Sequence, residues 1–275
     1  MISRSVRQCF IFYWTALIPL TSSGLCFAQE QGTNTSNQSA SQALTVTQNQ
    51  AQQIIVAAVN AMGGESAWAT VADSTTSGTC APATQQGAQP AFNFRWIFAQ
   101  HEFRFDAGAE GNSTVMLSGH GNPQAFDSDG NRSLSSESIA LTRPFHLPGQ
   151  VLAAALNDNR FRISLIGNEP LNGTSAVHAQ IRHMLLHSDE PGSTQDWWFD
   201  PNSHLPLQVT FNFPGQEIQA YLPFTYSFLA WNSEGGLLVP GVIAESMYPN
   251  IPIQTCSISQ LQINTQPSSG IFDAR

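Results

Sequence analysis

Apolar and polar residues alternate along much of this sequence after residue 90, and this period of two restricts the possible folds. The clearest runs are Phe92 to Phe98, Leu205 to Phe213 and Phe224 to Phe228. Residues two positions apart in a strand project from the same face of a sheet, so each run predicts a strand with one apolar face. Further strands are expected at 103–105, 114–117, 177–181, 242–248 and 256–263, the last with a bulge near Ser259.

Two segments depart from this pattern and predict helices. Apolar residues from Ala51 to Met62 recur at helical spacing, between a capping box at Thr47-Gln48-Asn49-Gln50 and a stop at Gly63-Gly64. The segment Pro148 to Asn157 has proline at the first helical position and an apolar face. The sequence therefore predicts an α+β protein, in which a large curved antiparallel sheet carries both helices on one face.

The N-terminus has the features of an export signal. Two arginines precede an apolar stretch of eleven residues from Phe10 to Leu20, and Cys26-Phe27-Ala28 resembles a cleavage site. A helix that spans a bilayer needs about 20 apolar residues, so this stretch is too short to be a membrane anchor. We expect residues 1–28 to be removed and the protein to reach the periplasm, and a lipid anchor on Cys26 is the alternative.

The mature chain divides into two parts. Residues 29–46 consist mainly of glutamine, serine, threonine and asparagine, which bury too little surface to fold, so a disordered tether is expected. No repeat or change of composition divides residues 47–275. We expect them to form a single domain that is monomeric and not integral to the membrane.

Two cysteines, Cys80 and Cys256, remain after removal of the signal peptide. An oxidising compartment favours a disulfide between them, which would close a loop over most of the domain. The alternative is two separate buried thiols, because a free cysteine packs as a small apolar side chain.

Composition excludes several classes of function. The formal net charge is −9 and the isoelectric point is about 5.1, whereas nucleic acids and anionic membrane surfaces bind basic faces. All ten basic residues are arginine, which rules out Schiff-base lysines, P-loop lysines and Ser-Lys dyads. No nucleic-acid partner is therefore expected.

Motifs for catalysis and metal binding are absent from the sequence. It contains neither G-x-S-x-G nor H-E-x-x-H. His183 and His187 would share one face of a helix, but the alternation over 177–181 favours a strand, where four positions separate them by about 13 Å. The acidic segment at 127–131 places Glu137 too close for a calcium loop. We expect a protein that is not an enzyme, with no catalytic residue, metal or cofactor.

The segment Trp197 to Leu207, WWFDPNSHLPL, predicts a hairpin. Asp200-Pro201-Asn202-Ser203 has the composition of a type I turn. Adjacent residues of a strand point to opposite faces, so Trp197 and Trp198 cannot form one aromatic platform. The length of the loop decides which tryptophan lies inside, and the sequence leaves both arrangements open.

Aromatic residues concentrate on one face of the predicted strands. A completely filled sheet core accounts for most of this density. An incompletely filled core would instead leave a cavity for an apolar ligand. The residues predicted to line such a cavity are Phe92, Phe94, Trp96, Phe98, Phe103, Phe105, Phe211 and Phe213.

Four segments together resemble a known family: AAVNAMGGESAW at 57–68, HLPGQVL at 146–152, the hairpin at 197–207 and QINTQPSSGIF at 262–272. In this order they are similar to the periplasmic outer-membrane lipoprotein carriers (Lol carriers, LolA/LolB-like) and their bacterial relatives. The resemblance implies a half-open antiparallel barrel with the helices packed on its concave face as a lid, and an apolar cavity for acyl chains. In the carriers an arginine on an early strand helps to hold the lid, but Arg95 and Arg104 lie in no matching motif, so this role is not transferred.

Two functions follow from these observations. The first is a non-catalytic envelope protein that binds an apolar ligand, a lipid or the acyl chain of a lipoprotein, in the half-barrel cavity. The alternative is a protein-interaction or sensing module on the same scaffold, with a filled interior and no ligand. Fold alone does not decide between them.

Overall fold

The structure, a computed structural model, describes residues 34–83, 90–99, 102–109, 112–119, 122–126, 145–185, 193–214, 221–247 and 250–273. Met1–Ser41 and Gln42–Arg275 form two separate units. The described helices are α1 (Asn34–Ala61), α2 (Glu65–Ala69), α3 (Pro148–Asn157) and the 3-10 helix η3 (Ser269–Phe272). None of the helices in these ranges is long and apolar enough to cross a membrane.

Twelve strands form one antiparallel sheet in the described part of the chain, in the order β5-β4-β3-β2-β1-β12-β11-β10-β9-β8-β7-β6. Their bounds are β1 Asp73–Pro82, β2 Phe92–Ala99, β3 Glu102–Ala109, β4 Asn112–Gly119, β5 Asn122–Phe126, β6 Phe161–Leu171, β7 Thr174–His183, β8 Thr194–Phe199, β9 Pro206–Pro214, β10 Tyr221–Glu234, β11 Leu237–Met247 and β12 Ile251–Ile263.

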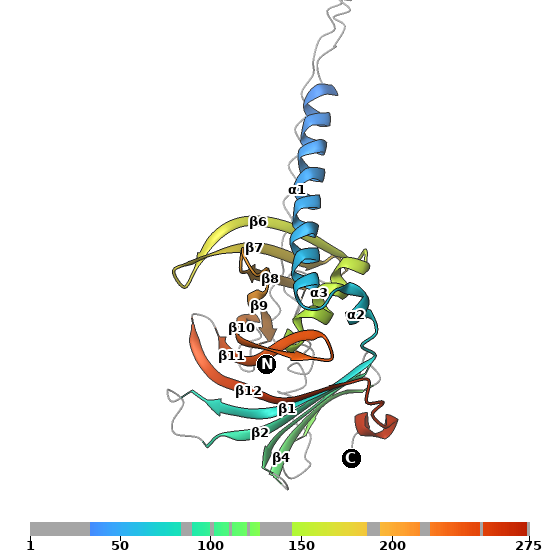
Figure 1. Cartoon of the computed structure of the whole chain (residues 1–275), viewed down its shortest axis with the longest axis vertical. Coiled ribbons are helices and arrows are strands. Elements are labelled where there is room, and N and C mark those ends of the chain that lie inside the picture. Colours follow the sequence, from blue (N-terminus) through green and yellow to red (C-terminus); the bar gives the residue numbers. More distant parts are fainter. Residues whose placement is uncertain are drawn as a thin grey trace, which may run out of the picture. The chain divides into compact units, whose positions relative to one another are not determined.

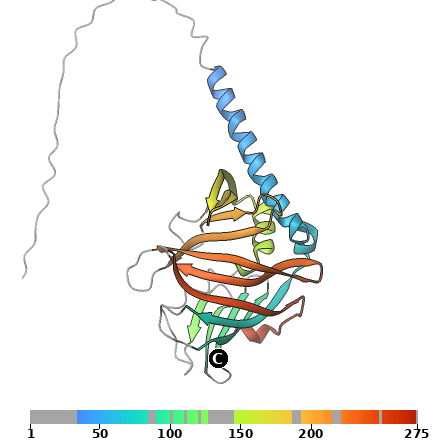
Figure 2. The ribbon, with the colours of Figure 1, turned by 60° about the vertical axis from the view of Figure 1, so that its left-hand side comes forward.

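The sheet is open, with β5 and β6 at its two edges, and it curves round α3 and the second half of α1 (Figures 1 and 2). Every neighbouring pair of strands is consecutive in sequence except β1 and β12, which join the two arms of the sheet, β2–β5 and β6–β11. This is the predicted α+β fold, with a half-open antiparallel sheet and both helices on its concave face.

The core lies between the helices and the concave face. The predicted stripe of α1 is buried, with Ile55 and Met62 fully inaccessible to solvent, and α3 buries Leu152 and Ala155. α3 has the predicted bounds. The predicted bulge is present as well, because Ser77 of β1 pairs with Gln260 and Gly78 pairs with Ile258, which leaves Ser259 unpaired.

Two predictions of local structure were wrong. α1 begins at Asn34, so Thr47 lies inside the helix and residues 34–46 are helical rather than disordered. No glycine or proline lies between Asn34 and Thr47 to stop a helix, and adding residues to an existing helix is cheap. β5 contains Pro123 and lies at the edge of the sheet, where a strand tolerates a residue without a backbone N–H. The predicted signal peptide, with Cys26, lies outside the described residues.

A disulfide joins Cys80 and Cys256, as predicted. The two residues face each other directly in the pairing of β1 with β12, and neither is accessible to solvent. The covalent link therefore lies at the pairing that joins the two arms of the sheet.

Gly149 at the start of α3 packs directly against Trp68 of α2, whose Nε1 donates to Met62 O at 3.2 Å. A Cβ at position 149 would overlap the indole ring. We expect Gly149→Ala to lower the free energy of unfolding by about 1–3 kcal/mol, because neither the buried ring nor the helix can move freely. Urea denaturation measures this, with Ala154→Ser on the exposed face of α3 as control. A stability equal to that of the control variant would contradict the packing described.

Candidate functional site

The predicted ligand-binding residues form an aromatic wall on the concave face. Five of them are almost inaccessible to solvent, with exposed fractions of 3% or less: Phe94, Trp96, Phe103, Phe105 and Phe211. Phe92 and Phe98 are partly buried, and the side chain of Phe213 lies outside the described residues. The wall is continuous on β2 and β3, where the Phe94 and Trp96 ring centroids are 4.4 Å apart and those of Phe98 and Phe103 are 4.7 Å apart.

Two residues just before α3 pack against wall residues on both arms of the sheet. The Phe145 ring stacks on Phe211 of β9 with centroids 4.3 Å apart. The His146 ring lies 4.3 Å from Trp96 and 4.9 Å from Phe98. The chain's own side chains therefore occupy this part of the concave face, and a ligand-binding role for the wall stays a prediction.

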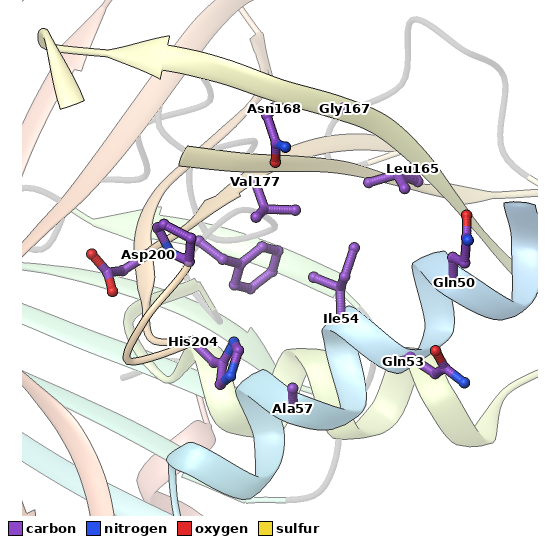
Figure 3. Close-up of a pocket in the computed structure, with 12 residues that line it drawn as sticks. Gln50, Gln53, Ile54, Ala57, Leu165, Gly167, Asn168, Val177, Asp200 and His204 are labelled. Atoms are coloured by element: carbon purple, nitrogen blue, oxygen red, sulfur yellow. The ribbon is translucent and has the colours of Figure 1, made fainter. Parts of the chain in front are cut away.

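A pocket of about 420 Å³ lies elsewhere on the concave side, between α1, the β6–β7 hairpin and the turn after β8 (Figure 3). None of the eight predicted residues lines it. The described residues around it are Gln50, Gln53, Ile54, Ala57, Leu165, Gly167, Asn168, Val177, Phe199, Asp200, Pro201 and His204.

Apolar side chains from the helix and the sheet form the floor of this pocket. Ile54 projects from α1 toward Leu165 of β6 and Val177 of β7 (Figure 3). A bulge in β6 contributes to the space, because Leu165 pairs with Ala179 and Gly167 pairs with His178. A Cβ at position 167 would meet no atom within 4 Å. The pocket therefore exists where a bulge and a glycine remove side-chain volume beneath the helix.

The turn that follows β8 forms one rim of the pocket and begins at Asp200, as predicted. Asp200 Oδ1 accepts hydrogen bonds from Ser203 N at 2.7 Å and from Asn202 N at 2.9 Å. The bond from Ser203 N is the largest cause that lowers the pKa of the Asp200 carboxyl, and the charge of nearby His204 lowers it further. His204 N donates to Asp200 O at 2.9 Å, and His204 has a positive φ of 61°. The rim thus holds an ionised carboxylate at neutral pH.

The two tryptophans of the hairpin lie on opposite faces, as predicted, and the structure resolves which is inside. Trp197 pairs with Val209 and is fully buried. Trp198 lies on the outer face, where its ring stacks on His178 with centroids 4.3 Å apart. His178 in turn bonds to Glu169 at 2.9 Å and to Asp196 at 3.0 Å. A polar network therefore ties β6, β7 and β8 together on the outer surface.

Comparison with known proteins gives matches to structures only. No protein-family model matches the sequence, and no curated protein matches it. A domain from Vibrio parahaemolyticus, assigned to an outer membrane lipoprotein-sorting protein, superposes with a TM-score of 0.51 at 14% identity, covering 81% of this chain and 95% of that one. A LolA superfamily protein from Nitrosomonas europaea gives a TM-score of 0.53 at 13% identity, covering 81% and 97%. The chain has a LolA-like fold.

A DUF1329 family protein from Desulfovibrio piger shares this LolA-like fold, with a TM-score of 0.52 at 12% identity, covering 82% of this chain and 97% of that one. The resemblance predicted from four short segments is thus confirmed at the level of the fold. At identities of 12–14% the likeness extends no further.

Neither early-strand arginine of this LolA-like fold bonds to α1 or α3 among the described residues. Arg104 donates from Nε to Asp106 Oδ1 and from Nη1 to Ile271 O of η3, both at 2.8 Å. Arg95 donates from Nη2 to Asp106 Oδ2 at 2.9 Å. The bond to Ile271 holds η3 against β3, so Arg104 supports the C-terminal segment, whereas Arg95 pairs with Asp106 of β3.

His183, the first histidine of the pair, lies in a strand, as the alternation predicted. His183 is the last residue of β7, and His187 lies outside the described residues. In the part of the chain that the structure describes, no group of three or more His, Cys, Asp or Glu residues is arranged to hold a metal ion.

Proposed function

We propose that this protein is an exported, non-catalytic protein of the periplasm that binds an apolar ligand, a lipid or a lipoprotein acyl chain, in the pocket beneath α1. The pocket itself carries the proposal. Its volume of about 420 Å³ falls within the range of about 300–1,000 Å³ typical of small-molecule sites. Its floor is apolar, and it lies between a helix and the concave face of the sheet. The LolA-like fold, shared with a domain described for lipoprotein sorting, supports the same class of ligand.

The chemistry of the lining supports binding rather than catalysis. The described lining residues include no serine, threonine, cysteine, tyrosine or lysine that could serve as a nucleophile. Asp200 uses its Oδ1 in the hydrogen bonds of its own turn. A bound molecule would therefore be held by apolar contact and by amide groups.

A specific observation favours the second candidate, an interaction or sensing module without a ligand. The space beside the aromatic wall is occupied by Phe145 and His146, whose rings pack on Phe211 and Trp96 respectively. If the pocket beneath α1 were too small for a stable complex, this filled scaffold would act through its surface. The first candidate predicts that natively purified protein carries a bound lipid, and the second predicts the mass of the unliganded protein.

A variant that fills the pocket tests the proposal. Ala57→Phe places a ring on the pocket side of α1, and Gln52→Phe places the same ring on its exposed side. We expect native mass spectrometry of wild type and Gln52→Phe, each purified from its own envelope fraction, to show a bound lipid. Ala57→Phe should lose it, with affinity for an apolar fluorescent probe reduced about tenfold or more, a change of about 1.4 kcal/mol. A clean unliganded mass for stringently washed wild type would overturn the proposal and favour the second candidate.

A further inference from the structure

We infer that the pocket beneath α1 discriminates by head group, accepting amphiphiles whose head is uncharged and hydrogen-bonding and disfavouring those whose head is anionic. This inference rests on the proposed function, because it names the class of ligand for the same pocket. Three features of the described lining carry it: the sign of its charge, the kind of polar group it presents, and the place of these groups at its rim.

At neutral pH the described residues at the rim of the pocket carry no net positive charge. Of the described lining residues, Asp200 carries a carboxylate and His204 is the only one able to become a cation, since no arginine lines the pocket. The hydrogen bonds from Ser203 and Asn202 keep Asp200 ionised by lowering its carboxyl pKa, and His204 is near enough to contribute to the same shift. A charge on His204 would therefore be offset by Asp200, and the pair sums to zero or to one negative charge.

The rest of the chain supplies few positive charges that could attract an anionic head group to the pocket. The whole chain has 19 acidic against ten basic residues, all of them arginine, and a formal net charge of −9. The described arginines nearest in sequence to the lining residues of β6 and β7 are Arg162 and Arg182, which face each other in the hairpin, and neither lines the pocket. A carboxylate or phosphate head that enters the pocket would meet no arginine there, whereas recognition of such groups relies on arginine forks or lysine.

Amide groups supply the alternative chemistry. Asn168 of β6 extends from its strand toward the pocket, and Gln50 and Gln53 lie along α1 at the other edge (Figure 3). An amide has one acceptor oxygen and two N–H donors, so it can pair with hydroxyl and amide groups and can donate to an ester. No hydrogen bond joins these three side chains to another described residue. They are therefore available to an uncharged head group whose chain lies against Ile54 and Val177.

The experiment compares two ligands with the same acyl chain, dodecanoic acid and its glycerol monoester. The first has a carboxylate head and the second an uncharged head with an ester and two hydroxyls. Each displaces an apolar fluorescent probe from the full exported protein at neutral pH and low salt. We expect the monoester to bind about five- to tenfold more tightly, the size of effect that one like charge at a partly hydrated rim produces. The ratio should shrink as salt is added, because the repulsion is screened.

Asp200→Asn tests the origin of the preference. Asparagine keeps the side-chain oxygen that caps the turn, and Glu234→Gln removes the same charge from an exposed residue at the end of β10. We expect the ratio to fall by at least half in Asp200→Asn and to stay unchanged in Glu234→Gln. Equal or tighter binding of dodecanoic acid to wild type would overturn the inference and leave the proposed function standing, as would a ratio unchanged in Asp200→Asn. Failure of both ligands and the probe to bind a folded protein would overturn the proposed function itself.

Discussion

Trp197→Ala is expected to lower the free energy of unfolding by about 3–5 kcal/mol, whereas Trp198→Ala next to it should cost about 1 kcal/mol. Trp197 is fully buried, its Nε1 donates to Gln195 Oε1 at 3.0 Å, and its ring packs 6.1 Å from Phe145. Its removal leaves a large cavity that the surrounding aromatic rings cannot close. Trp198 lies on the outer face, where truncation leaves space open to solvent and loses one ring stack.

Chemical denaturation of the two variants measures this difference. We expect the unfolding midpoint of Trp197→Ala to lie well below that of Trp198→Ala. The slope of the unfolding free energy against denaturant concentration should be the same for both if their native and unfolded states are alike. Far-ultraviolet circular dichroism before denaturation checks that each variant is folded. Equal losses of stability for the two variants, or a larger loss for Trp198→Ala, would contradict the hairpin register in which Trp197 pairs with Val209.

Removal of the disulfide is expected to have an effect of similar size. Cys80 and Cys256 are separated by 176 positions in sequence, and closing so long a loop in the unfolded chain corresponds to about 5 kcal/mol in the chain-entropy account. We expect the double variant Cys80→Ala/Cys256→Ala to lose about 4–5 kcal/mol, mainly through an unfolded state with more freedom. Denaturation of wild type with and without reductant provides the matched comparison, because the reduced protein keeps the volume of both side chains.

Counting free thiols and comparing oxidised with reduced protein distinguishes stabilisation by the disulfide from stabilisation by the packing of the two side chains. Unreduced, denatured wild type should contain no alkylatable thiol in its mature chain. If reduced wild type were as stable as the oxidised protein, while the double variant were destabilised, the effect of the substitutions would be due to lost side-chain volume rather than to the covalent link.

The strands and the second helix could be predicted because their signals are local. Pro148 at the start of α3 and the apolar face that follows set its bounds without reference to any distant residue. The facing of Trp197 and Trp198 also followed from their adjacency alone. Their register did not, because it depends on a bulge between Trp198 and Phe199 that only the pairing with β9 defines.

The candidate pocket could not be predicted for a similar reason. Ile54 belonged to the expected apolar stripe of α1, and Val177 to an expected strand, but nothing in either pattern indicates a gap between them. That gap depends on the bulge at Gly167 and on how closely the helix approaches β6. The packing against the aromatic wall depends likewise on Phe145, which is distant in sequence from Trp197 and Phe211, the residues that its ring contacts.

The pairing of β1 with β12 also determines how the domain would respond to mechanical load. The first residues of β1 lie opposite the last residues of β12, as in the pair Ser74 and Ile263. Force applied through the two ends of the chain would therefore open this pair of strands one residue pair at a time, the geometry in which antiparallel strands resist least. The opening would stop at Cys80 and Cys256, where a covalent bond carries the load. The residues between them, with both arms of the sheet and most of the pocket lining, would bear no tension.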